Sequence, residues 1–435
     1  MKGWDAARVA AAAGAELVRE SGGEPERVSI DSRAAGPGDL FVGLVGEHTD
    51  GGRFAQGALD AGAWGALVSP AFADATGGAV LTAADPLAAM GALAREWRRA
   101  LGASVIAVTG SVGKTSTKEL LTSLLAPLRR TVSSRANFNT DIGMPPEILA
   151  ADPGTEVLVL EAAMRGFGEI ATLRDICEPD VAVITNIAPV HLEQVGSLEG
   201  VARAKAELLP GVATAVVPAG EVLLDPYLDG LNVTRFGDGG DVHLDGDSVV
   251  AFGEPLDLEL AFRAEHHRIN TLAAVAACLA IGVRPSGRVE LPVGHLRGER
   301  IELPCGALVI NDCYNASPLS MRAALAELSA EPAEGRRVAV LGDMLELGSR
   351  EAELHREVGE AAAAAGVDVL VTVGPRSVAM LDAFDGESYA VADAGEAASL
   401  VEEILEPTDL LLVKGSRGVG LEVVAEALLE AAPHG

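Results

Sequence analysis

The sequence is poor in cysteine. Its 435 residues include four cysteines, Cys177, Cys278, Cys305 and Cys313, and no two of them form a C-x-x-C pair. Scattered single cysteines in a chain of this length are typical of buried or incidental thiols in a reducing compartment. We therefore expect neither a disulfide framework nor a zinc site.

Long apolar runs are also missing. No stretch reaches the roughly 18 consecutive apolar residues that a membrane helix needs, although 49% of the residues are hydrophobic and can build cores. The first eight residues do not show the basic-then-apolar order of a signal peptide. The sequence thus predicts a cytoplasmic protein that does not insert into membranes.

Positive charge is scarce. Lysine and arginine number 33 against 63 acidic residues, which gives a net charge of −30. Such a surface repels nucleic acid and anionic membranes, so we expect neither as a partner. The acidic residues are spread along the chain, which is typical of a solvated acidic surface. Basic residues inside motifs therefore carry more information here than they would in a basic protein.

The chain length predicts about three domains. Residues 1–83 show a small α/β pattern, and residues 84–292 alternate strands with helices in the βαβ rhythm of a parallel, doubly wound sheet. A third α/β unit follows at 293–435. Within this plan, we expect residues 211–261 to form an antiparallel extension and residues 282–294 to form a linker.

A glycine-rich loop after an apolar strand is the most informative feature. Residues 105–117 read Val-Ile-Ala-Val-Thr-Gly-Ser-Val-Gly-Lys-Thr-Ser-Thr. A strand, a glycine turn and a helix N-terminus direct backbone N–H groups and the helix dipole at a phosphate. Lys114 adds a positive charge, and Thr115 offers an oxygen to Mg²⁺. The residues expected to bind a nucleoside triphosphate are Gly110, Ser111, Val112, Gly113, Lys114, Thr115 and Ser116.

The spacing of this loop departs from the commonest phosphate-loop pattern. Val108 stands where G-x-x-x-x-G-K-[ST] has its first glycine, so the glycines are Gly110 and Gly113. An ordinary turn before a helix is the alternative interpretation of such a short loop. The preceding apolar strand and the following Lys-Thr pair favour the phosphate site.

Polar residues follow two further expected strands. Glu161 ends the strand at 157–160, while Asn186 and then His191 follow the strand at 181–185. Ligands of open α/β sheets lie beyond the carboxyl ends of the strands, so these residues should converge on the phosphate loop. Glu161 has the oxygen that Mg²⁺ prefers, and His191 could bind a second metal ion. The alternatives are a helix N-cap for the glutamate and a structural role for the histidine.

Three other features each have a structural interpretation beside the functional one. The block Asn137-Phe-Asn-Thr-Asp-Ile-Gly143 is rich in side-chain amides but could be an Asx-turn loop. Lys205 lies on a helical stretch at 198–209 and could belong to a solvated face with ion pairs. Asn270 opens an alanine-rich helix, where N-capping alone could explain it.

The third unit has polar blocks after three strands. These blocks are Asn311-Asp-Cys-Tyr-Asn-Ala-Ser-Pro318, Gly342-Asp-Met-Leu-Glu-Leu-Gly348 and Lys414-Gly-Ser-Arg417. Since the carboxyl ends of parallel strands meet at one edge, we expect a second ligand surface there.

Together these motifs resemble the Mur ligase family over nearly the whole chain. Asp31-Ser-Arg33, the phosphate loop, Thr185-Asn-Ile-Ala-Pro-Val-His-Leu-Glu193 and Ala202-Arg-Ala-Lys-Ala-Glu207 carry the likeness, together with the blocks above. The tyrosine-asparagine block and the Gly-Asp-Met-Leu-Glu-Leu-Gly block are similar to the branch that adds D-alanyl-D-alanine to a UDP-N-acetylmuramoyl tripeptide.

The resemblance implies a monomeric, ATP- and Mg²⁺-dependent amide ligase of peptidoglycan precursor synthesis. It implies a UDP-sugar domain, a central P-loop ATPase-like domain, and a C-terminal Rossmann-like domain that closes over the amine. The implied catalytic residues are Lys114, His191 and Lys205, the last carbamylated in several members. The implied metal ligands are Thr115, Glu161, His191 and Lys205, and further ATP contacts are Asn270, Arg300 and Asp312. The expected substrate contacts are Asp31, Ser32, Arg33, Asn137, Asn139, Thr140, Asn186, Tyr314, Asn315, Lys414, Ser416 and Arg417.

The alternatives to this function are a ligase with other substrates, a P-loop switch or motor, and a silent scaffold. A Mur-type ligase could join a different amino acid or peptide to another carboxylate, as folate and amino-acid polymer ligases do. A P-loop switch or motor would need features such as Asp-x-x-Gly after a strand, of which no convincing case is found. A silent scaffold is disfavoured because the set Lys114, Thr115, Glu161, His191 and Lys205 is intact.

Overall fold

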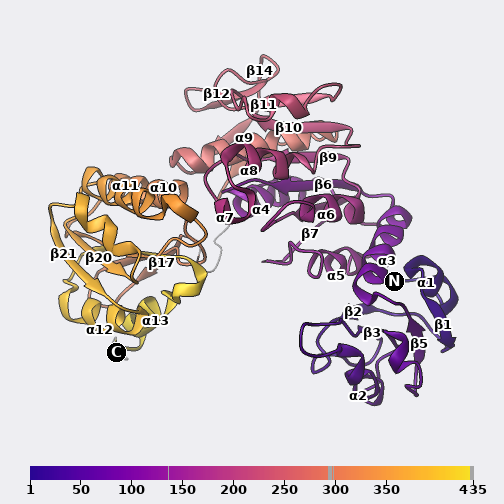
Figure 1. Cartoon of the computed structure of the whole chain (residues 1–435). Helices are drawn as coiled ribbons and strands as arrows, with labels where there is room; N and C mark the ends of the chain where they lie inside the picture. Colours follow the sequence, from indigo (N-terminus) through magenta and orange to yellow (C-terminus); the bar gives the residue numbers. More distant parts are fainter. Residues whose placement is uncertain (136, 292–295, 297, 432–435) are drawn as a thin grey trace. The chain divides into compact units, whose positions relative to one another are not determined.

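The computed structural model describes residues 1–135, 137–291, 296 and 298–431. These residues form a mixed α/β protein with four sheets, which confirms the predicted fold class (Figure 1). They group into two compact units, one of residues 1–186, 202–261 and 267–290, the other of residues 187–201, 262–266 and 291–435. The predicted domain boundary between 292 and 293 lies outside the described residues.

The N-terminal module is a five-stranded sheet in the order β1-β5-β4-β3-β2. Only β1 runs antiparallel to its neighbour. Its core contains Phe41, Leu59 and Val80. The elements are α1 Ala6–Ala13, β1 Glu16–Arg19, β2 Arg27–Ser29, β3 Asp39–Val42, α2 Ala55–Asp60, β4 Gly65–Val68 and β5 Ala79–Thr82.

Helix α3, Pro86–Leu101, leads into the central module. Its Asp85 side chain caps the first turn by accepting the N–H groups of Leu87 and Ala88, and Pro86 occupies the first helical position. Proline suits this position because its ring fixes φ near the helical value and because an N–H there would have no helical partner.

The central sheet has the order β14-β13-β12-β11-β10-β9-β6-β8-β7, with β6 between β9 and β8. The strands from β7 to β12 pair in parallel, and only β12-β13-β14 are antiparallel. The expected antiparallel extension at 211–261 is therefore wrong for its first strands, which continue the parallel sheet. The strands are β6 Ser104–Thr109, β7 Thr131–Ser133, β8 Val157–Glu161, β9 Val181–Ile184, β10 Thr214–Pro218, β11 Val233–Phe236, β12 Val242–Asp245, β13 Ser248–Ala251 and β14 Glu254–Pro255.

A small parallel pair corrects the predicted linker at 282–294. Strand β16, Gly287–Val289, pairs with β15, Leu258–Leu260. Part of the expected linker is therefore ordered by backbone pairing to a strand about thirty residues earlier, and residues 292–294 lie outside the described part. A local count of glycine and proline carries no information about such a distant partner.

The C-terminal sheet has six strands in the order β17-β18-β22-β19-β20-β21. Alternate residues of β19 face opposite sides. Val338 and Val340 pack with helices α12 (Ala394–Ile404) and α13 (Glu422–Ala431), while Ala339 and Leu341 pack with α10 (Pro318–Ala330) and α11 (Glu351–Ala364) (Figure 1). All its pairs are parallel except the antiparallel pair of β17 with β18, and both faces are covered, as parallel strands require. The strands are β17 Glu299–Glu302, β18 Leu308–Asn311, β19 Arg337–Gly342, β20 Val369–Val373, β21 Glu387–Val391 and β22 Leu410–Lys414.

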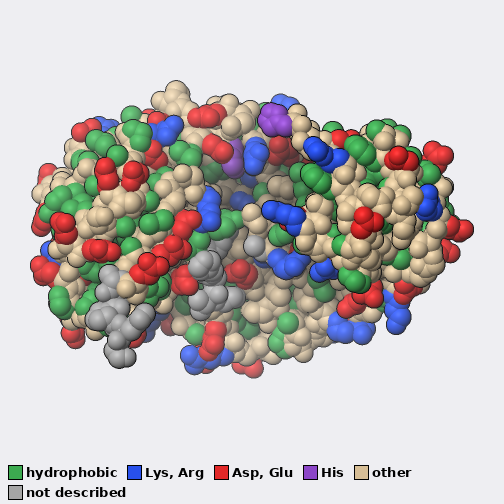
Figure 2. Space-filling model, turned by 90° about the horizontal axis from the view of Figure 1, so that it is seen from below, with side chains coloured by type: hydrophobic (Ala, Val, Ile, Leu, Met, Phe, Trp, Pro, Cys, Tyr) green, Lys and Arg blue, Asp and Glu red, His purple; other side chains and the backbone are tan. Residues whose placement is uncertain are grey.

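The remaining α-helices vary from single turns to four turns. They are α4 Lys114–Leu125, α5 Met144–Leu149, α6 Glu169–Cys177, α7 Leu192–Val195, α8 Leu198–Ala206, α9 Glu265–Ala280, α10 Pro318–Ala330, α11 Glu351–Ala364, α12 Ala394–Ile404 and α13 Glu422–Ala431. Among the described residues, no helix combines the length and apolar character that a membrane crossing demands. Figure 2 shows carboxylate side chains spread over the visible face, as the even distribution along the sequence predicts.

The loop between β6 and α4 depends on two glycines with positive φ. Gly110 has φ of 146°, and a Cβ placed on it would lie 1.9 Å from Thr185 Oγ1. Gly113 has φ of 82°, and its Cβ would lie 2.6 Å from Asn270 Oδ1. Glycine is required at both positions because neighbouring side chains approach the backbone closely.

The loop after β19 is held by hydrogen bonds of its backbone and of its Asp343 side chain. Met344 N–H donates to His355 Nε2 at 2.9 Å, and Leu345 N–H donates to Ser416 Oγ at 3.1 Å. The carboxylate of Asp343 accepts the N–H of Ser377 at 2.8 Å. The three partners belong to α11 and to the segments that follow β22 and β20, so the shape of the loop depends on distant parts of the C-terminal module.

Replacing Gly110 by alanine tests the close approach in the phosphate loop. Gly102→Ala is the matched control, because Gly102 also has positive φ but has no atom within 4 Å of its Cβ position. We expect Gly110→Ala to cost about 1–3 kcal/mol more than the control in urea unfolding. It should also weaken nucleotide binding in calorimetry. If Gly110→Ala and Gly102→Ala had equal unfolding midpoints and the same nucleotide affinity, the predicted clash of the new Cβ with Thr185 would be contradicted.

A second variant tests the buried histidine below the 342–348 loop. Burial lowers the pKa of His355, against the raising influence of the Glu351 carbonyl and of Asp343. The unfolded chain therefore takes up a proton near pH 6.5 while the folded protein does not, so stability is complete above pH 6.5 and falls as pH drops below it. Between pH 7 and 5 the wild type should lose stability more steeply than His355→Gln, by at most about 1.4 kcal/mol per pH unit. Parallel slopes in urea titrations of the two proteins would be the contrary result.

Candidate active site

The phosphate loop lies between two strands that end in polar residues. Val108 of β6 pairs with Glu161 of β8, and Thr109 pairs with Ile184 of β9. The carboxyl ends of the three strands therefore meet at one edge. This register brings Glu161 and Asn186 to the loop, which is the convergence that the sequence predicts for these two residues.

Glu161 is the centre of a buried hydrogen-bond cluster. Its side chain is 2% exposed. Oε2 accepts from Thr115 Oγ1 at 2.8 Å, and Oε1 accepts from Asn139 Nδ2 at 2.9 Å. One carboxylate thus joins the helix start, the amide-rich block and strand β8. The cluster presents carboxylate and hydroxyl oxygens together, which is the donor set that Mg²⁺ prefers.

Lys205 is buried beside this cluster. It is 1% exposed, so the alternative of a solvated helix face is wrong. Desolvation lowers its pKa well below the ordinary value; the charge of Lys114 lowers it further, and Glu161 and Glu169 oppose the shift. These influences place the amine within electrostatic range of the phosphate loop. A lysine with such a pKa spends more time as a neutral, nucleophilic amine.

Asn186 and Lys114 both contact the backbone of the loop. Asn186 Oδ1 accepts Val112 N–H at 3.0 Å, and its Nδ2 donates to Val112 O at 2.9 Å. The side chain of Asn186, expected to contact substrate, therefore shapes the loop. Lys114 Nζ donates to the carbonyl oxygens of Gly110 at 2.9 Å and Ser111 at 3.3 Å.

Asn270 lies against the second glycine of the loop. It is 8% exposed and is the sixth residue of α9, so N-capping does not explain it. Its amide atoms are the nearest atoms to the Cβ position of Gly113. The structure thus brings a residue more than 150 positions away in the sequence to the expected nucleotide site.

Two supporting residues escaped the sequence analysis. Lys118 is 2% exposed, and its Nζ donates to the carbonyl oxygen of Ser134 at 2.7 Å. Ser134 Oγ in turn accepts the N–H of Glu161 at 3.1 Å. Lys118 follows Thr115 by three positions on α4, and this spacing puts both on one helix face. That spacing is the signal by which Lys118 could have been found.

The polar blocks of the C-terminal unit also meet at one sheet edge. Strand β22 lies between β18 and β19, and Lys414 ends it. Lys414 is 2% exposed; its Nζ donates to Asp312 Oδ2 at 2.7 Å and to Asn315 O at 2.9 Å. Ser416 is also buried and holds Leu345. Lys414 and Ser416 are both expected to contact substrate. In the structure, Lys414 holds the loop after β18 and Ser416 holds the loop after β19.

Other predicted residues of this unit have partners of their own. Arg300 forms ion pairs with Glu331 at 2.7 Å and Glu327 at 3.5 Å. His191, which belongs to the same compact unit, hydrogen-bonds through Nδ1 to the carboxylate of Glu346. The convergence of His191 on Glu161 stays a prediction. Half-buried Tyr314 and exposed Asn315 and Arg417 follow the strand ends.

The remaining predicted contacts lie in exposed or half-buried loops. Asp31 accepts two hydrogen bonds from the Arg33 guanidinium, which lower the pKa of its carboxyl to about 2. Ser32 between them is half-buried. In the amide-rich block, Asn137 and Thr140 are exposed, and only Asn139 reaches Glu161.

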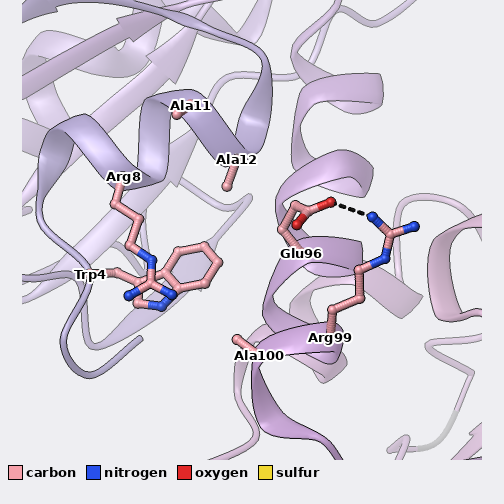
Figure 3. A pocket seen from close by; sticks show the side chains of 7 residues that line it. All are labelled: Trp4, Arg8, Ala11, Ala12, Glu96, Arg99 and Ala100. Atoms are coloured by element: carbon pink, nitrogen blue, oxygen red, sulfur yellow. Dashed lines mark hydrogen bonds and ion pairs between the residues drawn. The ribbon is translucent and has the colours of Figure 1, made fainter.

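A groove of about 560 Å³ lies elsewhere, between α1 and α3 (Figure 3). Its basic side chains have partners: the Arg8 guanidinium lies 4.3 Å from the centre of the Trp4 ring, and Arg99 pairs with Glu96 and Glu178. Ala11, Ala12 and Ala100 form much of the remaining lining. The groove does not include any of the residues predicted to act on a substrate.

Comparison with protein families accounts for most of the two larger modules. Residues 108–278 match the Mur ligase middle domain, and residues 296–417 match the glutamate ligase domain of Mur ligases. Both glycines of the phosphate loop, Glu161 and Lys205 lie within the first match. The blocks that follow β18, β19 and β22 lie within the second.

Individual relatives and solved structures extend over nearly the whole chain. The UDP-N-acetylmuramoyl-tripeptide--D-alanyl-D-alanine ligase of Synechocystis is 36% identical and covers 93% of this chain and 92% of its own length. MurF from Acinetobacter baumannii has a TM-score of 0.88 at 31% identity, covering 98% and 99%. MurF from Thermotoga maritima, solved in complex with ADP, has a TM-score of 0.80 at 29% identity, covering 93% and 97%. The chain belongs to the Mur ligase family, in its UDP-N-acetylmuramoyl-tripeptide--D-alanyl-D-alanine ligase branch.

Proposed function

We propose that this protein joins D-alanyl-D-alanine to a UDP-N-acetylmuramoyl tripeptide and converts ATP to ADP and phosphate. The relatives are named for this reaction, and MurF from Thermotoga maritima was solved in complex with ADP. The observation that carries the proposal is the buried cluster of Thr115, Glu161 and Asn139 at the end of the phosphate loop. The reaction belongs to peptidoglycan precursor synthesis.

The chemistry explains why a phosphate site is needed. A carboxylate has no leaving group that an amine could displace. A carboxylate oxygen of the tripeptide therefore attacks the γ-phosphorus of ATP, the bond to ADP breaks, and an acyl phosphate forms. The amine of D-alanyl-D-alanine then attacks the acyl carbon. The tetrahedral intermediate loses a proton and expels phosphate, which leaves the amide.

The phosphate loop supplies the charge that the first step requires. Lys114 and the N–H groups at the start of α4 would stabilise the negative charge that develops on the transferred phosphoryl group. In the structure the Lys114 ammonium rests on the carbonyl oxygens of Gly110 and Ser111. These contacts keep it at the loop, within reach of an arriving triphosphate.

Mg²⁺ fits the residues that surround Glu161. The buried carboxylate and the Thr115 hydroxyl lie 2.8 Å apart and offer hard oxygen ligands. When bound, the ion would neutralise phosphate charge and orient the phosphoryl group. We assign Thr115 and Glu161 as ligands of this ion. His191 and a carbamylated Lys205 would be further metal ligands.

Lys205 is suited to carbamylation. Its burial and the nearby Lys114 charge favour the neutral amine, which is the form that reacts with CO₂. The neutral amine nitrogen bonds to the carbon of CO₂ and releases one proton, which converts an uncharged buried amine into a negatively charged carbamate. The negative product would be stabilised by the same Lys114 charge that destabilises the ammonium form.

The C-terminal module would supply the amine site and further nucleotide contacts. We assign Asp312, Arg300 and Asn270 to ATP, and Tyr314, Asn315 and Arg417 to the amine substrate. Asp31, Ser32 and Arg33 would contact the UDP-sugar from the N-terminal module. A monomer would be sufficient, since the chain itself carries every group that the reaction uses.

Replacing Lys114 by alanine tests the phosphate-loop assignment. With ATP, Mg²⁺, the UDP-muramoyl tripeptide and D-alanyl-D-alanine, phosphate release should fall at least about 100-fold, while exposed Lys2→Ala keeps wild-type rates. An active Lys114→Ala enzyme would refute the assignment. Release by the wild type with another amine, but not with D-alanyl-D-alanine, would replace the proposed substrate.

Carbamylation of Lys205 is tested by chemical rescue. Lys205→Ala should be inactive and regain part of its activity with short carboxylates such as propionate, whereas the buried control Lys118→Ala should not respond. Carbon NMR with ¹³C-bicarbonate should show a carbamate signal in the wild type that Lys205→Ala lacks. Absence of both the rescue and the signal would exclude the modification.

A further inference from the structure

The segment that contains His191 contacts one loop of the C-terminal module at two points. His191 Nδ1 hydrogen-bonds to the carboxylate of Glu346. Glu193, two residues later, lies against Gly348: a Cβ placed on that glycine would be 3.7 Å from Glu193 Cγ. All four residues belong to one compact unit, which groups residues 187–201 with residues 291–435.

The loop that carries Glu346 is held by hydrogen bonds that do not involve His191. The preceding residues are held by the bonds of Met344 to His355, of Leu345 to Ser416 and of Ser377 to Asp343. His355 is buried and its pKa is lowered by burial, so it stays a neutral acceptor at Nε2. Glu346 is therefore presented from a preorganised loop, and little conformational freedom is lost in forming its contact.

Both partners adopt a backbone conformation that costs energy. His191 has φ of 53° and Glu346 has φ of 63°, which is the left-handed region. Residues other than glycine stay in this region only where the surrounding structure requires it, and such residues cluster at functional sites. Here the two strained residues meet each other through their side chains.

The contact defines which ring nitrogen carries the proton. An ionised carboxylate only accepts hydrogen bonds, so Nδ1 of His191 must be the donor. In the neutral ring this leaves the lone pair on Nε2. Carboxylates that accept the second N–H of a ligating histidine fix its tautomer and orientation in many metal sites.

We propose that Glu346 is a positioning residue for His191. It holds the imidazole as the Nδ1–H tautomer, with Nε2 as the nitrogen that acts in the ligase site, and it fastens the histidine segment to the C-terminal module. The role of His191 in the reaction rests on the proposed function, whereas the contact and the tautomer do not. The Gly-Asp-Met-Leu-Glu-Leu-Gly block thereby gains a function in the reaction.

Nitrogen NMR of protein labelled with ¹⁵N-histidine tests the contact directly. The chain has eight histidines, and the His191 signals are those that His191→Gln removes. We expect Nδ1 to be the protonated nitrogen in the wild type and the tautomers to become mixed in Glu346→Gly. Glu346→Gln keeps an acceptor oxygen and should lie between them. Glycine also relieves the strained backbone, so the variant should fold, with an unfolding midpoint at or above that of the wild type.

Hydrogen exchange and kinetics complete the test. Amides of residues 187–201 should exchange faster in Glu346→Gly, and kcat should fall about 10- to 100-fold. The control is Glu353→Gln, an exposed glutamate of the same unit paired with Arg350, which should match the wild type in every measurement. Unchanged His191 shifts in Glu346→Gly would overturn the contact. Changed shifts with kcat within twofold of the wild type would overturn the positioning role. A wild type without ligase activity would refute the proposed function, while the shifts would still decide the contact.

Discussion

The nucleotide site depends on the hydrogen bonds that the carboxylate of Glu161 accepts. The carboxylate is buried at the end of β8, and burying a charge without partners is costly. Thr115 and Asn139 donate hydrogen bonds to this carboxylate. The backbone N–H of Glu161 itself donates to Ser134 Oγ. The phosphate loop, the amide-rich block and β8 are therefore held in one arrangement by a single side chain. Removing that side chain would leave the buried Thr115 hydroxyl and the half-buried Asn139 amide without this acceptor, and would also leave a gap.

The scarce lysines of this acidic chain are concentrated where phosphate and carboxylate chemistry is expected. The chain has five lysines, and three of them, Lys118, Lys205 and Lys414, are at most 2% exposed. Arginine supplies most of the surface ion pairs instead. A lysine ammonium loses more hydration on burial than a guanidinium, and its pKa shifts readily. The three buried lysines thus differ in what they contact: Lys118 supports Ser134, Lys414 fastens the loop after β18, and burial lowers the pKa of Lys205.

Much of this organisation could be predicted from sequence, because strand ends and loops leave local signals. The sequence shows the strand-turn-helix pattern around Lys114, the polar residues after β8 and β9, and the three polar blocks of the C-terminal sheet. The failures have a common cause. Strand β16 pairs with a distant strand, β10 and β11 extend the parallel sheet, and Asn270 reaches Gly113 from a distant helix. Each depends on a partner that no local pattern encodes.

The sequence by itself determined the fold class, the phosphate loop and the family resemblance, because these depend on hydrophobic period, on glycine spacing and on residue types in order along the chain. Only the tertiary structure decided what individual polar side chains do. Asn186, Lys414 and Ser416 turned out to hold loops, Lys205 to be buried, and His191 to bind Glu346. The physical reason is that burial and hydrogen-bond partners are set by segments far apart in sequence, and these alone fix the charge, tautomer and orientation of each group.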